Sequence, residues 1–158
     1  MGKWFCLRCK RSISGRQGLF CKRCLEVLSS ATSDQLSTFL EAIDSPSAIL
    51  GRDLTFINSN TLLDKMLKTF AHDLIAMKIG DALECLYAVK HGPCGKDPVC
   101  LHCGIKRVVD LTSITGEKFS DIPLVLRHAS GEERTLHFTF GKLASATLII
   151  FKNVAQVL

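Results

Sequence analysis

Hydrophobic residues recur with a helical period in one early segment of the chain. From about residue 34 to residue 44, after Ser33 as a candidate N-cap, the apolar positions fall on one face and predict an amphipathic helix. This apolar stripe consists of Leu36, Phe39, Leu40 and Ile43. We expect this stripe to pack on the domain that follows, against a second copy of the chain, or on both.

The pattern then changes to a mixture of strands and helices. Two apolar runs at 48–50 and 54–57 predict a hairpin, and helical spacing follows from Leu62 to Phe70 and from Cys103 to Gly116. In the last third, alternation predicts strands at 121–128 and 133–143, and a continuous apolar run from Thr147 to Phe151 predicts a central strand at 146–154. This order indicates an α+β fold with a five-stranded antiparallel sheet and flanking helices.

Eight cysteines divide into two sets of four, which is the number that two tetrahedral thiolate sites require. In the first set, eleven residues separate two Cys-x2-Cys pairs, a spacing typical of a structural zinc site. Its predicted ligands are Cys6, Cys9, Cys21 and Cys24.

The first set predicts a small zinc-ribbon or knuckle-like head over residues 1–28. We expect its turn at Ser12, Ser14, Gly15 and Gly18, and a short helix that begins after Cys24. Residues 29–44 form the linker and amphipathic helix, and residues 45–158 form the larger domain. The head depends on its metal for folding energy, and we expect the two units to have separate cores.

The second set is irregularly spaced and predicts a site for zinc or for an iron–sulfur cluster. Its predicted ligands are Cys85, Cys94, Cys100 and Cys103. Cys103 lies at a predicted helix start, where unpaired backbone N–H groups favour a thiolate. His91 and His102 are alternative ligands beside these cysteines. Zinc would hold the loop permanently, whereas a cluster could change its redox state.

Disulfides are the alternative interpretation of so many cysteines, but they require an oxidising compartment. The N-terminal residues lack an apolar signal core, and no apolar run reaches the length of a membrane-spanning helix. We therefore expect a cytoplasmic protein that does not insert into a membrane.

The net charge of +5 is concentrated in the first 24 residues, which contain seven cations and no acid. These cations are Lys3, Arg8, Lys10, Arg11, Arg16, Lys22 and Arg23. They either offset the negative charge of a zinc ion bound by four thiolates or contact nucleic acid.

The order of elements over about residues 34–158 resembles the PAS domain family. The segment from Ile43 to Leu50, followed by Asp53 to Asn60, is similar to the opening of that fold. The three closing strands and the segment Phe151 to Val154 resemble its end. Around the second cysteine set, the chain resembles a cysteine-bearing subgroup of PAS domains in bacterial signalling proteins. That resemblance implies the same four cysteine ligands, and PAS sensors variously hold iron–sulfur clusters, haem or flavin.

No phosphate-binding loop and no kinase or nuclease motif is present, so we expect no enzyme. The resemblance implies a metal-binding sensory module for redox or ligand signals, acting through a protein partner or as a homodimer. The alternative is a nucleic-acid-binding regulator whose basic zinc head is controlled by the PAS domain. A thiol redox enzyme is a third hypothesis.

Overall fold

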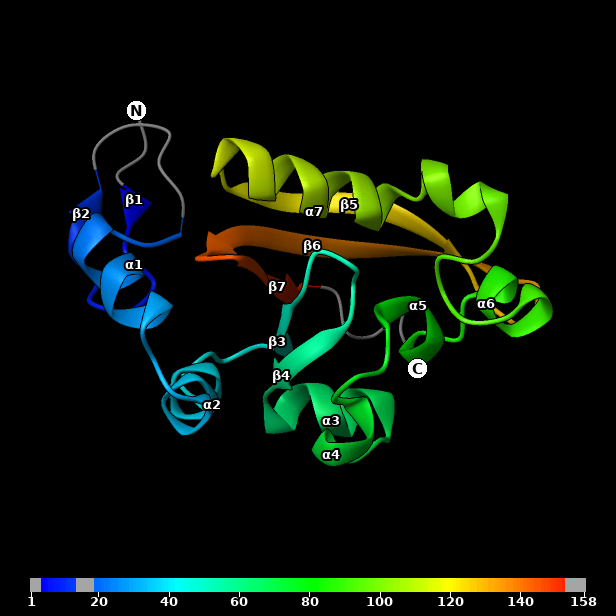
Figure 1. The fold of residues 1–158 in the computed structure, drawn as a ribbon, viewed down its shortest axis with the longest axis horizontal. Coiled ribbons are helices and arrows are strands. Elements are labelled where there is room, and N and C mark those ends of the chain that lie inside the picture. The colour runs from blue at the N-terminus through cyan, green and yellow to red at the C-terminus, as the bar shows by residue number, and fades with distance from the viewer. Residues whose placement is uncertain (1–3, 14–18, 153–158) are drawn as a thin grey trace.

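The computed structural model describes residues 4–13 and 19–152. Its main feature is a five-stranded sheet in the order β4-β3-β7-β6-β5, in which every neighbouring pair is antiparallel. The strands are β3 (Ser47–Leu50), β4 (Phe56–Ser59), β5 (Phe119–Arg127), β6 (Glu133–Leu143) and β7 (Ala146–Phe151). The predicted α+β fold and five-stranded antiparallel sheet are confirmed (Figure 1).

Helix α2 (Ser33–Glu41) precedes the first strand of this sheet. The helices that connect its first two strands to its last three are α3 (Thr61–Leu67), α4 (Ala71–Leu74), α5 (Ile79–Ala82), α6 (Leu86–His91), the 3₁₀ helix η1 (Pro98–His102) and α7 (Gly104–Thr115). The helix predicted after Cys103 is confirmed, and it ends where Gly116 adopts the left-handed conformation, with φ of 72°. Among the described residues, no helix combines the length and apolar character needed to cross a bilayer.

Several predicted boundaries differ from the structure. Thr32, rather than Ser33, is the N-cap of α2, because its side chain accepts from the Gln35 backbone while the Gln35 side chain accepts from the Thr32 backbone. The helix predicted up to Phe70 ends at Leu67, since Lys68 is left-handed there. The turn positions Ser14, Gly15 and Gly18 and the end of the last predicted strand lie outside the described residues.

The sheet has a hydrophobic cluster on each face. Side chains alternate along β7, so Ile149 and Phe151 pack under the helices on the inner face, while Leu148 and Ile150 pack on the outer face. Phe138 and Phe140 on β6 fill the inner face and are fully buried. The central strand β7 is therefore covered on both sides.

The outer cluster contains residues from three parts of the chain. Leu40 and Ile43, from α2 and its end, pack there on the sheet, as the apolar stripe predicted. Apolar residues of the head, including Phe20 and Leu28, belong to the same cluster. The expectation of separate cores is wrong, because the head alone cannot bury its apolar residues and uses the sheet to do so.

Asn60 fixes the junction between α2 and the sheet. Its side-chain oxygen accepts from the backbone N–H groups of Ser47 (3.0 Å) and Leu63 (3.0 Å). Its amide nitrogen donates to three backbone carbonyls, those of Leu40 (3.2 Å), Ile43 (3.3 Å) and Ser45 (2.9 Å). This buried side chain thus ties the end of α2, the start of β3 and the start of α3 together.

Candidate metal centre and its docking on the sheet

The head consists of two short strands and one helix, and it lies beyond the end of β6 (Figure 1). Its elements are β1 (Trp4–Phe5), β2 (Ser12–Ile13) and α1 (Lys22–Ser29). Cys6 and Cys9 lie on the turn between the strands, and Cys21 is the N-cap of α1. The helix begins at Lys22, so the predicted start after Cys24 is wrong and Cys24 projects from its first turn.

The four cysteines of the head converge on one point. The sulfur atoms of Cys6, Cys9, Cys21 and Cys24 all lie within 4.8 Å of one another. Cys9 Sγ and Cys21 Sγ are 3.7 Å apart. A tetrahedral ion with Zn–S bonds of about 2.3 Å separates its sulfurs by about 3.8 Å, so this spacing fits a shared ion, whereas a disulfide requires about 2.05 Å.

The surroundings of the four sulfurs shift the pKa values of Cys6 and Cys24 in opposite directions. Burial acts to raise the pKa of Cys6, but hydrogen bonds from the backbone of Cys9 and Cys21 help to outweigh it, and the pKa falls to about 6. Burial raises the pKa of Cys24 to about 12, against a lowering effect of the Arg8 side chain. A bound cation would supply the positive charge that the buried thiolates lack.

Among the described cations of the head, Arg8 contacts this cluster. Its Nη1 lies 3.8 Å from Cys24 Sγ and donates to it. This contact matches the prediction that head cations offset thiolate charge. The other described cations of the head, Lys10, Arg11, Lys22 and Arg23, are exposed. Their charges are therefore open to solvent.

Two contacts dock the head on the rest of the molecule. Leu19 packs so closely on β6 that a Cβ added at Gly141 would lie 2.2 Å from Leu19 Cδ1. The rings of Phe20 and Phe39 meet edge to face, with centroids 5.6 Å apart. Sequence analysis missed this docking surface. The one available signal was a glycine within the apolar alternation of β6, which marks close approach of another segment.

The second cysteine set lies around α6, η1 and the start of α7, at the end of the molecule away from the head (Figure 1). Cys85 is the N-cap of α6, Cys94 lies in the loop before η1, Cys100 lies in η1, and Cys103 is the N-cap of α7, as predicted. Cys94 is buried, whereas the other three are half-exposed. Burial raises the pKa of Cys94 to about 11, and Cys100 and Cys103 add smaller electrostatic contributions.

The second set is less compact than the first. A Cβ at Gly80 would lie 2.6 Å from Cys94 Sγ and 3.7 Å from the Cβ of Cys85, so these two cysteines flank Gly80. Within the described residues, however, no three sulfurs of this set all lie within 4.8 Å of one another, whereas the four of the head do. His91 contacts Asp97 instead of a sulfur, and His102 is exposed. A shared site here remains a prediction.

Among the comparisons with known proteins, only the comparison with solved structures finds similar proteins. No family model matches the sequence, and no curated protein matches it. The VqmA dimer of Vibrio cholerae, solved without its target DNA, is 14% identical with a TM-score of 0.50; the match covers 78% of this chain and 52% of that one. This chain therefore spans about half the length of VqmA.

Two further solved structures are PAS or sensory-box domains. A domain of a sensor histidine kinase/response regulator from Geobacter sulfurreducens is 12% identical (TM-score 0.46), and the match covers 77% of this chain and 93% of that one. A PAS domain from Desulfitobacterium hafniense is 22% identical (TM-score 0.45), with 73% and 98% covered. This protein shares its overall fold with VqmA, and it has a four-cysteine cluster near its N-terminus.

Proposed function

We propose that this protein is a PAS-type sensory module whose head is held together by a zinc ion on Cys6, Cys9, Cys21 and Cys24. The observation that carries the proposal is that the cysteine cluster and the outer face of the sheet share one hydrophobic cluster. Cys6 and Cys24 themselves belong to it. A change at the metal site therefore reaches the sheet through packed side chains rather than through a flexible linker.

The second cysteine set is proposed as the responsive site, with zinc or an iron–sulfur cluster on Cys85, Cys94, Cys100 and Cys103. Cys85 and Cys103 are the N-caps of helices. Cys94 belongs to the inner hydrophobic cluster, and Cys103 packs against that cluster. Drawing the four sulfurs onto one ion would require the loop around Cys94 to move. Such movement would be transmitted to α6 and α7 and is the kind of local change that a sensor uses.

The output of this module is proposed to pass through a protein partner or a second copy of the chain. A nucleic-acid-binding regulator is the second candidate, and the exposed Lys10, Arg11, Lys22 and Arg23 favour it. VqmA, which shares the fold, has a target DNA. Phosphate contacts by these cations would make binding fall steeply with salt, so salt-dependent binding that is lost in Lys22→Glu would favour this candidate.

Metal analysis with an absorption spectrum of anaerobically purified protein tests the main proposal. We expect Cys9→Ser to lose one equivalent of zinc and Cys100→Ser to lose the metal of the second set. A broad visible band that disappears only in Cys100→Ser would assign a cluster to the second set. Wild-type protein with no bound metal would refute the metal-binding function.

A further inference from the structure

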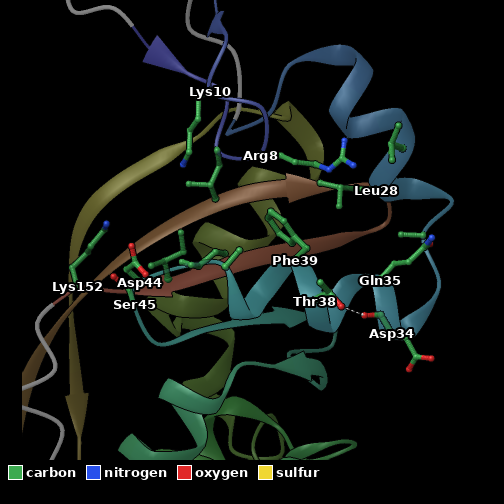
Figure 2. Close-up of a pocket in the computed structure, with 16 residues that line it drawn as sticks. Arg8, Lys10, Leu28, Asp34, Gln35, Thr38, Phe39, Asp44, Ser45 and Lys152 are labelled. Atoms are coloured by element: carbon green, nitrogen blue, oxygen red, sulfur yellow. Dashed lines mark hydrogen bonds between the residues drawn. The ribbon is translucent and has the colours of Figure 1, made fainter.

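An open groove lies where the head meets α2 (Figure 2). It has a volume of about 750 Å³, and its walls come from the head, from α2 and from the end of β7. Buried apolar side chains form its floor, namely Leu28, Ile43 and Ile150. Val27 lines it as well and is 44% exposed, so apolar surface remains open to solvent there.

Charged side chains are arranged unevenly around this groove. Arg8 and Lys10 lie on the head side, and Lys152 lies at the same end as Lys10, near Asp44 (Figure 2). Asp34 and Gln35 lie at the other end, with Phe39 between the two ends. The head side of the groove thus presents the cations Arg8 and Lys10, and Lys152 lies beside Asp44 at one end (Figure 2). The head side therefore favours a negatively charged ligand.

The combination of an apolar floor and a charged rim selects among kinds of partner. Nucleic acid would gain nothing from the buried Leu28 and Ile150, and its phosphates would meet Asp34 and Asp44. An amphipathic helix instead places an apolar stripe on such a floor and its charged residues at the rim. Its acidic residues would meet Arg8, Lys10 and Lys152.

We propose that this groove binds an amphipathic helix of a partner protein, with its apolar face on Val27, Leu28 and Phe39 and its carboxylates at Arg8 and Lys10. The inference rests on the proposed output through a protein partner. Arg8 contacts both the groove and Cys24 Sγ. Arg8 therefore takes part in both partner binding and metal binding. A bound metal should fix Arg8 in place and raise the affinity for the partner, and a bound partner should raise the affinity for the metal by the same factor.

A synthetic helix of about 16 residues is the probe, because shorter isolated helices are marginal in water. It carries leucines at i, i+3, i+4 and i+7 with glutamates on one flank, and fluorescence anisotropy measures its affinity for the metal-loaded full chain. Val27→Glu tests the floor, since the new carboxylate would be buried under the peptide. Val125→Glu is the matched control, because Val125 is 65% exposed on β5, away from the groove.

We expect Val27→Glu to weaken binding by at least about tenfold, Lys10→Glu to weaken it by several fold, and Val125→Glu to leave it unchanged. Replacing the peptide's glutamates with lysines should abolish binding. Binding that is absent from the wild type, or equally weakened by both valine variants, would overturn the groove proposal. Metal content is measured on the same samples, so a failure of the groove is distinguished from loss of the metal-held head.

Discussion

Leu19 of the head lies directly against Gly141 of β6, with no room for a side chain between them. A Cβ at position 141 would lie 2.2 Å from Leu19 Cδ1 and 3.1 Å from its Cβ, so rotating the end of the leucine would not relieve the clash. The head and the sheet thus meet as closely as two elements of one domain. Any description of the head as an independent module has to account for this contact.

Gly141→Ala should push the head away from the sheet. We expect a loss of about 1–3 kcal/mol in the free energy of unfolding, typical of an overpacked site, and faster hydrogen exchange in α1. A double-mutant cycle with Leu19→Ala tests the cause. In the Leu19→Ala background, Gly141→Ala should lower the free energy of unfolding by a smaller amount, because the clashing side-chain atoms of Leu19 are gone. Simple additivity of the two changes would contradict the contact.

Arg8→Gln should weaken metal binding by the head. The variant removes the cation 3.8 Å from Cys24 Sγ and so leaves the buried thiolate charge less well compensated. Loss of a group that hydrogen-bonds to a metal ligand costs about 10–100-fold in metal affinity, and we expect the lower end of that range because the contact is long. Competition with a chromogenic chelator measures it. Arg23→Gln removes an exposed cation of α1 in the same head and should leave affinity unchanged.

Asn60→Ala should be among the most destabilising single changes. It removes all five side-chain hydrogen bonds of a buried residue and leaves backbone groups at the junction unpaired. We expect a loss of about 3–5 kcal/mol in urea unfolding. Thr38→Ala, which removes an exposed hydroxyl bonded to the Asp34 carbonyl, should cost less than about 0.5 kcal/mol. Comparable losses for both variants would contradict this role.

Cys94 should react slowly with iodoacetamide in chelator-treated, folded protein. With burial raising its pKa to about 11 from an ordinary 9.0, the thiol holds about 100-fold less thiolate at pH 8, and the thiolate is the nucleophile. Mass spectrometry of digested, labelled protein follows each cysteine. Rapid labelling of Cys94, at the rate of the exposed Cys9, would show that its site is open.

The sequence predicted those parts of the fold that depend on local pattern. The helix of α7 between Cys103 and Gly116 and the long alternating strands β5 and β6 follow from side-chain period and turn residues within each segment. Helix ends were less certain, since the choice of Thr32 over Ser33 depends on which hydroxyl reaches the Gln35 backbone.

Contacts between distant segments could not be predicted in the same way. The packing of Leu19 on Gly141 joins residues that no local pattern relates. The spacing of the first cysteine set was regular enough to predict its convergence, because two Cys-x2-Cys turns can face each other. The second set depends on the path of the loop around Cys94, which its irregular spacing leaves undetermined.

We propose above all that a bound metal holds the head against the outer face of the sheet. Methyl NMR during metal removal by a chelator tests this proposal most directly, because consecutive residues of β7 face opposite sides. We expect the methyl signals of Leu148 and Ile150, in the outer cluster with the head, to shift or broaden, while those of Ile149, in the inner cluster, stay in place. Unchanged outer-face signals after complete metal removal would contradict it.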